Sequence, residues 1–74
     1  MTHDFSRPAE VKWHSDEQDA PADWSGAATF STLRDALDAI VNGTPQTGHP
    51  WVRSGGRSYA PHEVEDLWRE DRMR

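Results

Sequence analysis

Two adjacent glycines, Gly55 and Gly56, stand between two short runs that carry apolar residues, 51–54 and 57–60. Both central positions of the tightest hairpin turns need a positive φ angle, which glycine adopts without a steric cost. The sequence therefore predicts a β-hairpin with Gly55-Gly56 as its two-residue turn. The register of this hairpin decides which side chains share a face, so it constrains the fold more than any other feature.

In that register Val52 is opposite Tyr59, and Arg53 is opposite Ser58. Successive side chains of a strand point to opposite faces of the sheet. Val52 and Tyr59 are therefore expected on one face. The other face is expected to carry Trp51, Arg53, Ser58 and Ala60.

A helix is predicted to begin at Pro61, directly after the hairpin. Proline lacks a backbone N–H group, which costs nothing at the first position of a helix. Glu63 can accept a hydrogen bond from the backbone N–H of Ala60, and Tyr59 and Val64 occupy the two positions of a hydrophobic staple.

The strongest helical pattern covers residues 32–42, where apolar side chains recur at the spacing of one helix face. Thr32 and Asp35 stand at the two positions of an N-terminal capping box. Gly43 is expected in the left-handed conformation that ends many helices, and Pro45 prevents continuation. The apolar face consists of Leu33, Ala36, Leu37, Ile40 and Val41.

Residues 10–15 alternate apolar and polar side chains, which predicts a half-buried strand with Val11 and Trp13 on its core face. Residues 16–28 predict a long loop that Trp24 attaches to the body of the protein. Long structureless loops are uncommon in compact domains, so we expect a short extended run where this loop ends.

These elements predict a small two-layer α+β domain in the order strand, helix, hairpin, helix. Three strands would form one sheet, and both helices would pack on one face of it to bury their apolar sides. Residues 1–9 are predicted to form a flexible N-terminal arm and residues 10–74 a single domain. The predicted core consists of Val11, Trp13, Phe30, Leu33, Leu37, Ile40, Val41, Val52, Tyr59, Val64, Leu67 and Trp68.

The chain has 74 residues, no cysteine and no apolar run that approaches the roughly 20 residues needed to span a bilayer. Its first residues lack the basic region and apolar run of a secretory signal. We therefore expect a soluble cytoplasmic protein with no disulfide and no membrane contact.

The net charge of −5 argues against a general nucleic-acid binder, which would normally be basic. Residues 1–42 carry three basic and eight acidic side chains, whereas residues 43–74 carry five of each. Two arginines and no acidic residue stand between Gly43 and Ala60, so the hairpin is a locally positive element.

The sequence predicts no catalytic residue, no metal and no cofactor. No serine stands in a nucleophile motif, and the four histidines lack the spacing of metal ligands. His62 is the candidate base, because the dipole at the start of a helix disfavours its protonated form. An exposed helix position without a chemical role is the commoner outcome for such a histidine.

The remaining candidate is a partner surface made of Trp51, Arg53, Arg57, Lys12 and His14. An aromatic side chain beside cations on an open sheet face is typical of protein interfaces and of modules that hold single-stranded nucleic acid. The alternative is that Trp51 is covered, either by the N-terminal arm or by the loop around Trp24.

The sequence thus favours a non-enzymatic protein-interaction module whose partner is another protein or a second copy of the chain. A nucleic-acid-binding module that uses the hairpin face is the alternative, although the net charge disfavours it. The third hypothesis is a small enzyme or enzyme subunit that uses His62 with a nearby carboxylate.

Overall fold

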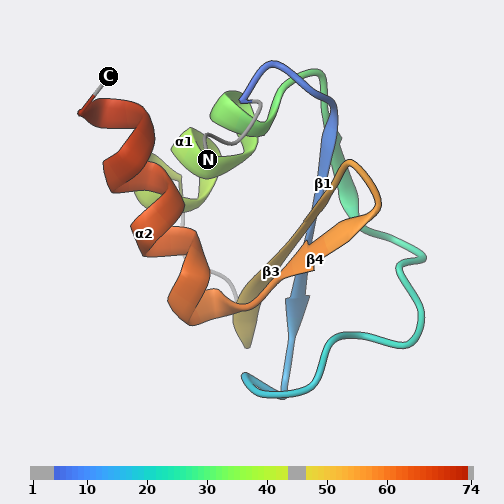
Figure 1. The fold of residues 1–74 in the computed structure, drawn as a ribbon. Helices are drawn as coiled ribbons and strands as arrows, with labels where there is room; N and C mark the ends of the chain where they lie inside the picture. The colour runs from blue at the N-terminus through green and yellow to red at the C-terminus, as the bar shows by residue number, and fades with distance from the viewer. Residues whose placement is uncertain (1–4, 44–46, 74) are drawn as a thin grey trace.

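The computed structural model describes residues 5–43 and 47–73, which form one antiparallel sheet and two helices. The strand order across the sheet is β2-β1-β3-β4 (Figure 1). The predicted small α+β domain is therefore confirmed. In chain order the elements are β1 (Ala9–His14), β2 (Ala28–Phe30), α1 (Leu33–Asn42), β3 (His49–Ser54), β4 (Arg57–Tyr59) and α2 (Pro61–Arg72).

Both helices lie on one side of the sheet, and residues 15–27 run along the other side (Figure 1). Helix α1 contacts β1 and β2, and helix α2 contacts β3 and α1. The prediction of two helices on one face is right, but the sheet has four strands in place of three. The additional strand is β2, the short extended run expected at the end of the loop, which pairs with the first half of β1.

The hairpin has the predicted register, with Val52 paired to Tyr59 across β3 and β4. Gly55 and Gly56 have φ angles of 61° and 79°. These are the positive values that a two-residue hairpin turn requires, so the turn chemistry read from the sequence is confirmed.

Helix α1 begins as predicted and ends differently. The hydroxyl oxygen of Thr32 accepts a hydrogen bond of 3.1 Å from the backbone N–H of Asp35. Gly43 has a φ angle of −85°, so the left-handed conformation predicted for it is wrong. Glycine is suited to this position for another reason, because a Cβ atom there would collide with the carbonyl oxygen of Ala39.

Helix α2 begins at Pro61, as predicted. The backbone N–H of Ala60 donates a hydrogen bond of 3.0 Å to the carboxylate of Glu63. Tyr59 and Val64, at the two staple positions, are both buried. The hairpin and the second helix are thus joined by a short and well-bonded connection.

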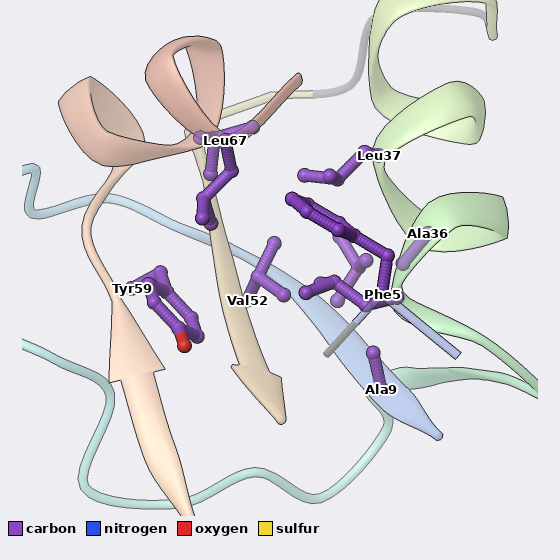
Figure 2. Close-up of a cluster of buried hydrophobic side chains, with 10 residues drawn as sticks. Phe5, Ala9, Ala36, Leu37, Val52, Tyr59 and Leu67 are labelled. Carbon is purple, nitrogen blue, oxygen red and sulfur yellow. The ribbon is translucent and has the colours of Figure 1, made fainter. Parts of the chain in front are cut away.

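The core lies between the two helices and the sheet, and it includes Phe5, whose ring is turned toward Leu37 of α1 (Figure 2). Val41 is 44% exposed, so its assignment to the core is wrong. Four other predicted core residues are only partly buried: Trp13, Phe30, Ile40 and Trp68. The buried cluster consists of Phe5, Ala9, Val11, Leu33, Ala36, Leu37, Val52, Tyr59, Val64 and Leu67.

Phe5 belongs to the stretch predicted as a flexible arm, yet only 3% of its surface is exposed. Its carbonyl oxygen accepts a hydrogen bond of 3.1 Å from the backbone N–H of Arg34, which fixes it against the start of α1. Residues 1–4 of the predicted arm lie outside the described residues. So does Pro45, which is predicted to prevent continuation of the first helix. Neither helix in the described ranges has the length and apolar composition required to cross a membrane.

Candidate interaction site

The structure divides the five predicted surface residues between the two sides of the sheet. Lys12, His14, Trp51 and Arg53 alternate with core residues along β1 and β3, so they face away from the helices. Arg57 pairs with Ser54 and lies toward α2, where its guanidinium stands 3.5 Å from the carboxylate of Glu63. A single surface made of all five residues is therefore absent from the described structure.

Residues 15–27, here called the covering segment, close over the outer face of the sheet. Trp51 is only 4% exposed, and its indole N–H donates a hydrogen bond of 2.7 Å to the carbonyl oxygen of Asp16. Pro21 of the covering segment is buried as well. The structure thus agrees with the alternative in which the loop around Trp24 covers Trp51.

Arg53 is engaged within the chain. Its guanidinium donates two hydrogen bonds, of 2.9 and 2.6 Å, to one carboxylate oxygen of Glu10 on the neighbouring strand. The same guanidinium lies 4.8 Å from the centre of the Trp24 ring, within the range of a cation–π contact. Arg53 thereby attaches the covering segment to the sheet.

Lys12 also bonds to the covering segment, since its ammonium group donates a hydrogen bond of 2.8 Å to the carbonyl oxygen of Ser25. The carboxylate of Asp16 accepts hydrogen bonds from the backbone N–H groups of Gln18 and Asp19, which lower the pKa of that carboxyl. His14 is half-buried beside this turn. The ammonium group of Lys12, the guanidinium of Arg53 and the indole of Trp51 are therefore all hydrogen-bonded within the chain.

A second feature is a cleft where β1 continues beyond Ala28, the first residue of β2. Helix α1 forms another wall of this cleft. We call it the β1-edge cleft. It has a volume of about 420 Å³. Its apolar lining comes from both strands and the helix and consists of Val11, Trp13, Ala28, Phe30, Ala39 and Ile40.

The edge of β1 itself forms one wall of this cleft. Val11, Lys12 and Trp13 are consecutive and all line it, although successive strand residues point to opposite faces. Strand β2 pairs with β1 only as far as Val11, so residues 12–14 have a strand neighbour on the β3 side alone. The cleft therefore combines apolar side chains with a length of open strand edge.

The covering segment turns away before it could fill this position. The backbone N–H of Ala27 donates a hydrogen bond of 3.1 Å to the carbonyl oxygen of Trp24, which closes a turn just ahead of β2. Gly26 in that turn has a φ angle of 78° and lines the cleft. The local turn thus delays the start of β2 until Ala28 and leaves the edge of β1 beyond Val11 open.

Sequence reasoning placed Trp13, Phe30 and Ile40 in the core and did not foresee the cleft. A signal was present in the apolar stripe of α1, which continues as far as Val41. The ten residues of α1 span about 15 Å, whereas the three residues of β2 span about 10 Å. A strand that short does not extend beside the whole length of the helix, and Ala39 and Ile40 line the cleft there.

The remaining candidates for chemistry are dispersed. His62 is exposed on the first turn of α2 and shares a hollow of about 470 Å³ with Glu17 and Gln18. The described part of the chain holds no group of three or more histidine and acidic side chains that could bind a metal ion. Comparisons of this chain with protein-family models, with curated proteins and with solved structures gave no match.

Proposed function

We propose that this chain is a non-enzymatic protein-interaction module whose docking site is the β1-edge cleft. The observation that carries the proposal is the group of large apolar side chains, Trp13, Phe30 and Ile40, that stay half-buried around an open cleft. Burial of such surface by a partner is favourable by roughly 25 cal/mol per Å². Apolar patches bordered by polar residues are typical of protein–protein contact sites.

This proposal moves the partner surface from the hairpin face to the neighbouring strand edge. Trp51 would meet a partner only after the covering segment had left it, whereas the partly exposed Arg53 is held by Glu10 and by the ring of Trp24. Lys12 belongs both to the predicted hairpin-face surface and to the β1-edge cleft. It lines the cleft, and its ammonium group bonds to Ser25 of the covering segment. The partner is another protein, and a second copy of the chain is the competing occupant.

Nucleic-acid binding has less support as a function. The ammonium group of Lys12 and the guanidinium of Arg53 are already bonded to Ser25 and to Glu10. A titration of the protein with single- and double-stranded oligonucleotides at low salt tests this alternative, since phosphate contacts are strongest there. Saturable binding at micromolar protein would favour it over the protein-interaction function.

In the enzymatic hypothesis, His62 would act in catalysis together with the carboxylate of Glu17, which lines the same hollow. Both side chains stand at the surface, where water competes for each hydrogen bond. General acid–base catalysis needs the two groups held near a substrate in a fixed geometry. The exposed hollow supports that function less well than the apolar cleft supports docking.

Site-specific photo-crosslinking in cells that produce the protein tests the proposed function. A photoreactive amino acid is placed at Ala39, which is exposed and lines the cleft, and in a second variant at Ala20, which is exposed in the covering segment. We expect a discrete crosslinked partner from Ala39 and none from Ala20. The partner identified in this way is then purified and its affinity is measured by calorimetry.

Substitution of Ala39 by glutamine would place an amide in the cleft without a change of net charge. We expect about tenfold weaker binding of the purified partner to this variant, with no change for the matched Ala20→Gln variant. Equal crosslinking from both positions, or equal affinity of both glutamine variants, would exclude the β1-edge cleft as the docking site.

A further inference from the structure

We infer that the β1-edge cleft binds an extended peptide segment with an apolar centre and basic ends, which adds to the sheet as a strand beside residues 12–14 of β1. The inference rests on the proposed function and specifies the chemistry of the partner segment.

Strand β1 has an open edge beside the cleft. On the β2 side, pairing stops at Val11, and β1 continues for three more residues that pair only with β3. An exposed strand edge presents backbone N–H and C=O groups that another extended chain can bond. Addition of such a strand is a recurrent way in which small domains bind peptides.

The apolar lining of the cleft lies beside that open edge. Alternate side chains of an added strand would point to the helix side of the sheet, where Trp13, Ala39 and Ile40 border the cleft. Its other side chains would point toward Lys12 and Gly26. A segment with apolar residues at alternate positions therefore matches the cleft better than a helix or a flat surface does.

The two elements on either side of the cleft carry more acidic than basic residues. The covering segment, which borders the cleft at Gly26, carries four acidic residues and no lysine or arginine. Helix α1 forms the other border and carries two acidic residues and Arg34, whose guanidinium is bonded to Asp71. Lys12 is the cation within the cleft, and it is bonded to Ser25. No carboxylate lines the cleft itself, but the covering segment and α1 are both net acidic, which favours a segment with lysine or arginine at its ends over one with acidic ends.

The same charges disfavour a second copy of this chain as the occupant. Two copies docked edge to edge would each bring a net charge of −5. Asp16 and Glu17, which stand just beyond Ser15 after the end of β1, would also come close to the net-acidic covering segment of the other copy. Like charges brought together in an interface oppose association.

Fluorescently labelled peptide pools test the inference with the intact protein. One pool has valine, isoleucine, leucine and threonine randomised at its central positions and lysine at both ends, and the matched pool has glutamate in place of lysine. At low salt we expect about tenfold tighter binding of the lysine pool, measured by fluorescence anisotropy. The difference should shrink as salt screens the charges. Equal binding of the two pools would overturn the assignment of basic ends.

Backbone pairing is tested by N-methylation of alternate amides in the tightest-binding peptide. Methylation removes backbone N–H donors. A peptide methylated at the amides that face β1 should therefore bind about tenfold more weakly, while a peptide methylated at the other amides should bind with unchanged affinity. The amide resonances of Lys12, Trp13 and His14 should shift on binding. Shifts confined to other residues, or equal binding of all methylated peptides, would overturn strand addition.

The glutamine variants link this test to the cleft, since Ala39→Gln should weaken peptide binding and Ala20→Gln should not. A concentration-dependent dimer that is lost in Ala39→Gln would identify a second copy as the occupant and overturn the inference. Failure of all peptides while a crosslinked partner is still captured from Ala39 would refute only the extended basic segment. Absence of any Ala39 crosslink would refute the proposed function itself.

Discussion

The indole N–H of Trp51 and the carbonyl oxygen of Asp16, 35 positions apart in the chain, are joined by a hydrogen bond of 2.7 Å. This bond fixes the start of the covering segment over the outer face of the sheet. Arg53 fixes the same segment further along, through its contact with the ring of Trp24. The covering segment thus buries Trp51 on a sheet face that would otherwise be open to water.

Truncation of Trp51 should destabilise the domain strongly. For Trp51→Ala we expect a loss of about 3–5 kcal/mol in the free energy of unfolding, because a buried aromatic side chain is removed. Trp51→Phe keeps most of the ring but removes the N–H donor, and we expect a smaller loss, about 1 kcal/mol from the hydrogen bond. Urea denaturation followed by circular dichroism measures both.

A loss below about 1 kcal/mol for Trp51→Ala would contradict the covered position of this residue. Trp68→Ala is the matched control for the truncation. Trp68 is only partly buried, with the guanidinium of Arg72 at 4.3 Å from its ring. Its removal should therefore cost less than the removal of Trp51.

Phe5 should contribute to stability as a core residue does. Substitution by alanine removes a side chain that is 3% exposed, and we expect a loss of about 3–5 kcal/mol. The whole stability of a domain of this size is roughly 4–11 kcal/mol, so Phe5→Ala should lower the melting temperature severely. Phe5→Leu, which preserves most of the apolar volume, serves as the milder variant. A melting temperature unchanged by Phe5→Ala would show that the N-terminal stretch does not belong to the core.

Local elements of this fold could be predicted because their signals lie within a few residues. The Gly55-Gly56 turn sets its own register, and Thr32 lies three residues from the amide it caps. Phe5 could not be assigned to the core in this way, since its burial depends on α1, which begins only at Leu33. A single aromatic residue in a polar stretch has no periodicity that would reveal its partner.

The candidate site was harder to predict for the same reason. Alternation along the hairpin correctly placed Trp51 and Arg53 on the face away from the helices. Their accessibility depends on Asp16 and Trp24, which lie in a loop without periodicity. The β1-edge cleft depends on where β2 begins, and a three-residue strand is too short for its bounds to be located by pattern.

The ion pair between Arg34 and Asp71 connects the start of α1 to the end of α2, with N–O distances of 2.9–3.2 Å. The side chain of Arg34 is 64% exposed, so water screens much of the attraction. For Asp71→Asn we expect a small loss of stability, which should shrink further at high salt. Glu65→Gln, which breaks the exposed pair with Arg69 within α2, is the control and should cost about 0.3–0.5 kcal/mol.

The attachment of the covering segment should depend on pH through Asp16. The backbone N–H groups of Gln18 and Asp19 stabilise its carboxylate and lower its pKa from the ordinary value of 3.8. A lowered pKa means that this contribution is complete above the ordinary value and is lost as the pH falls through the lowered one. Acidification should therefore loosen the turn that presents the carbonyl of Asp16 to Trp51.

Two-dimensional NMR measures this effect directly. The carboxyl carbon of Asp16 should titrate below 3.8, and the indole N–H resonance of Trp51 should change and exchange faster over the same pH range. In Asp16→Asn no carboxyl group titrates at this position, so the response of the Trp51 resonance in that range should disappear. An Asp16 carboxyl that titrates at or above its ordinary value would show that these hydrogen bonds do not hold the turn in solution.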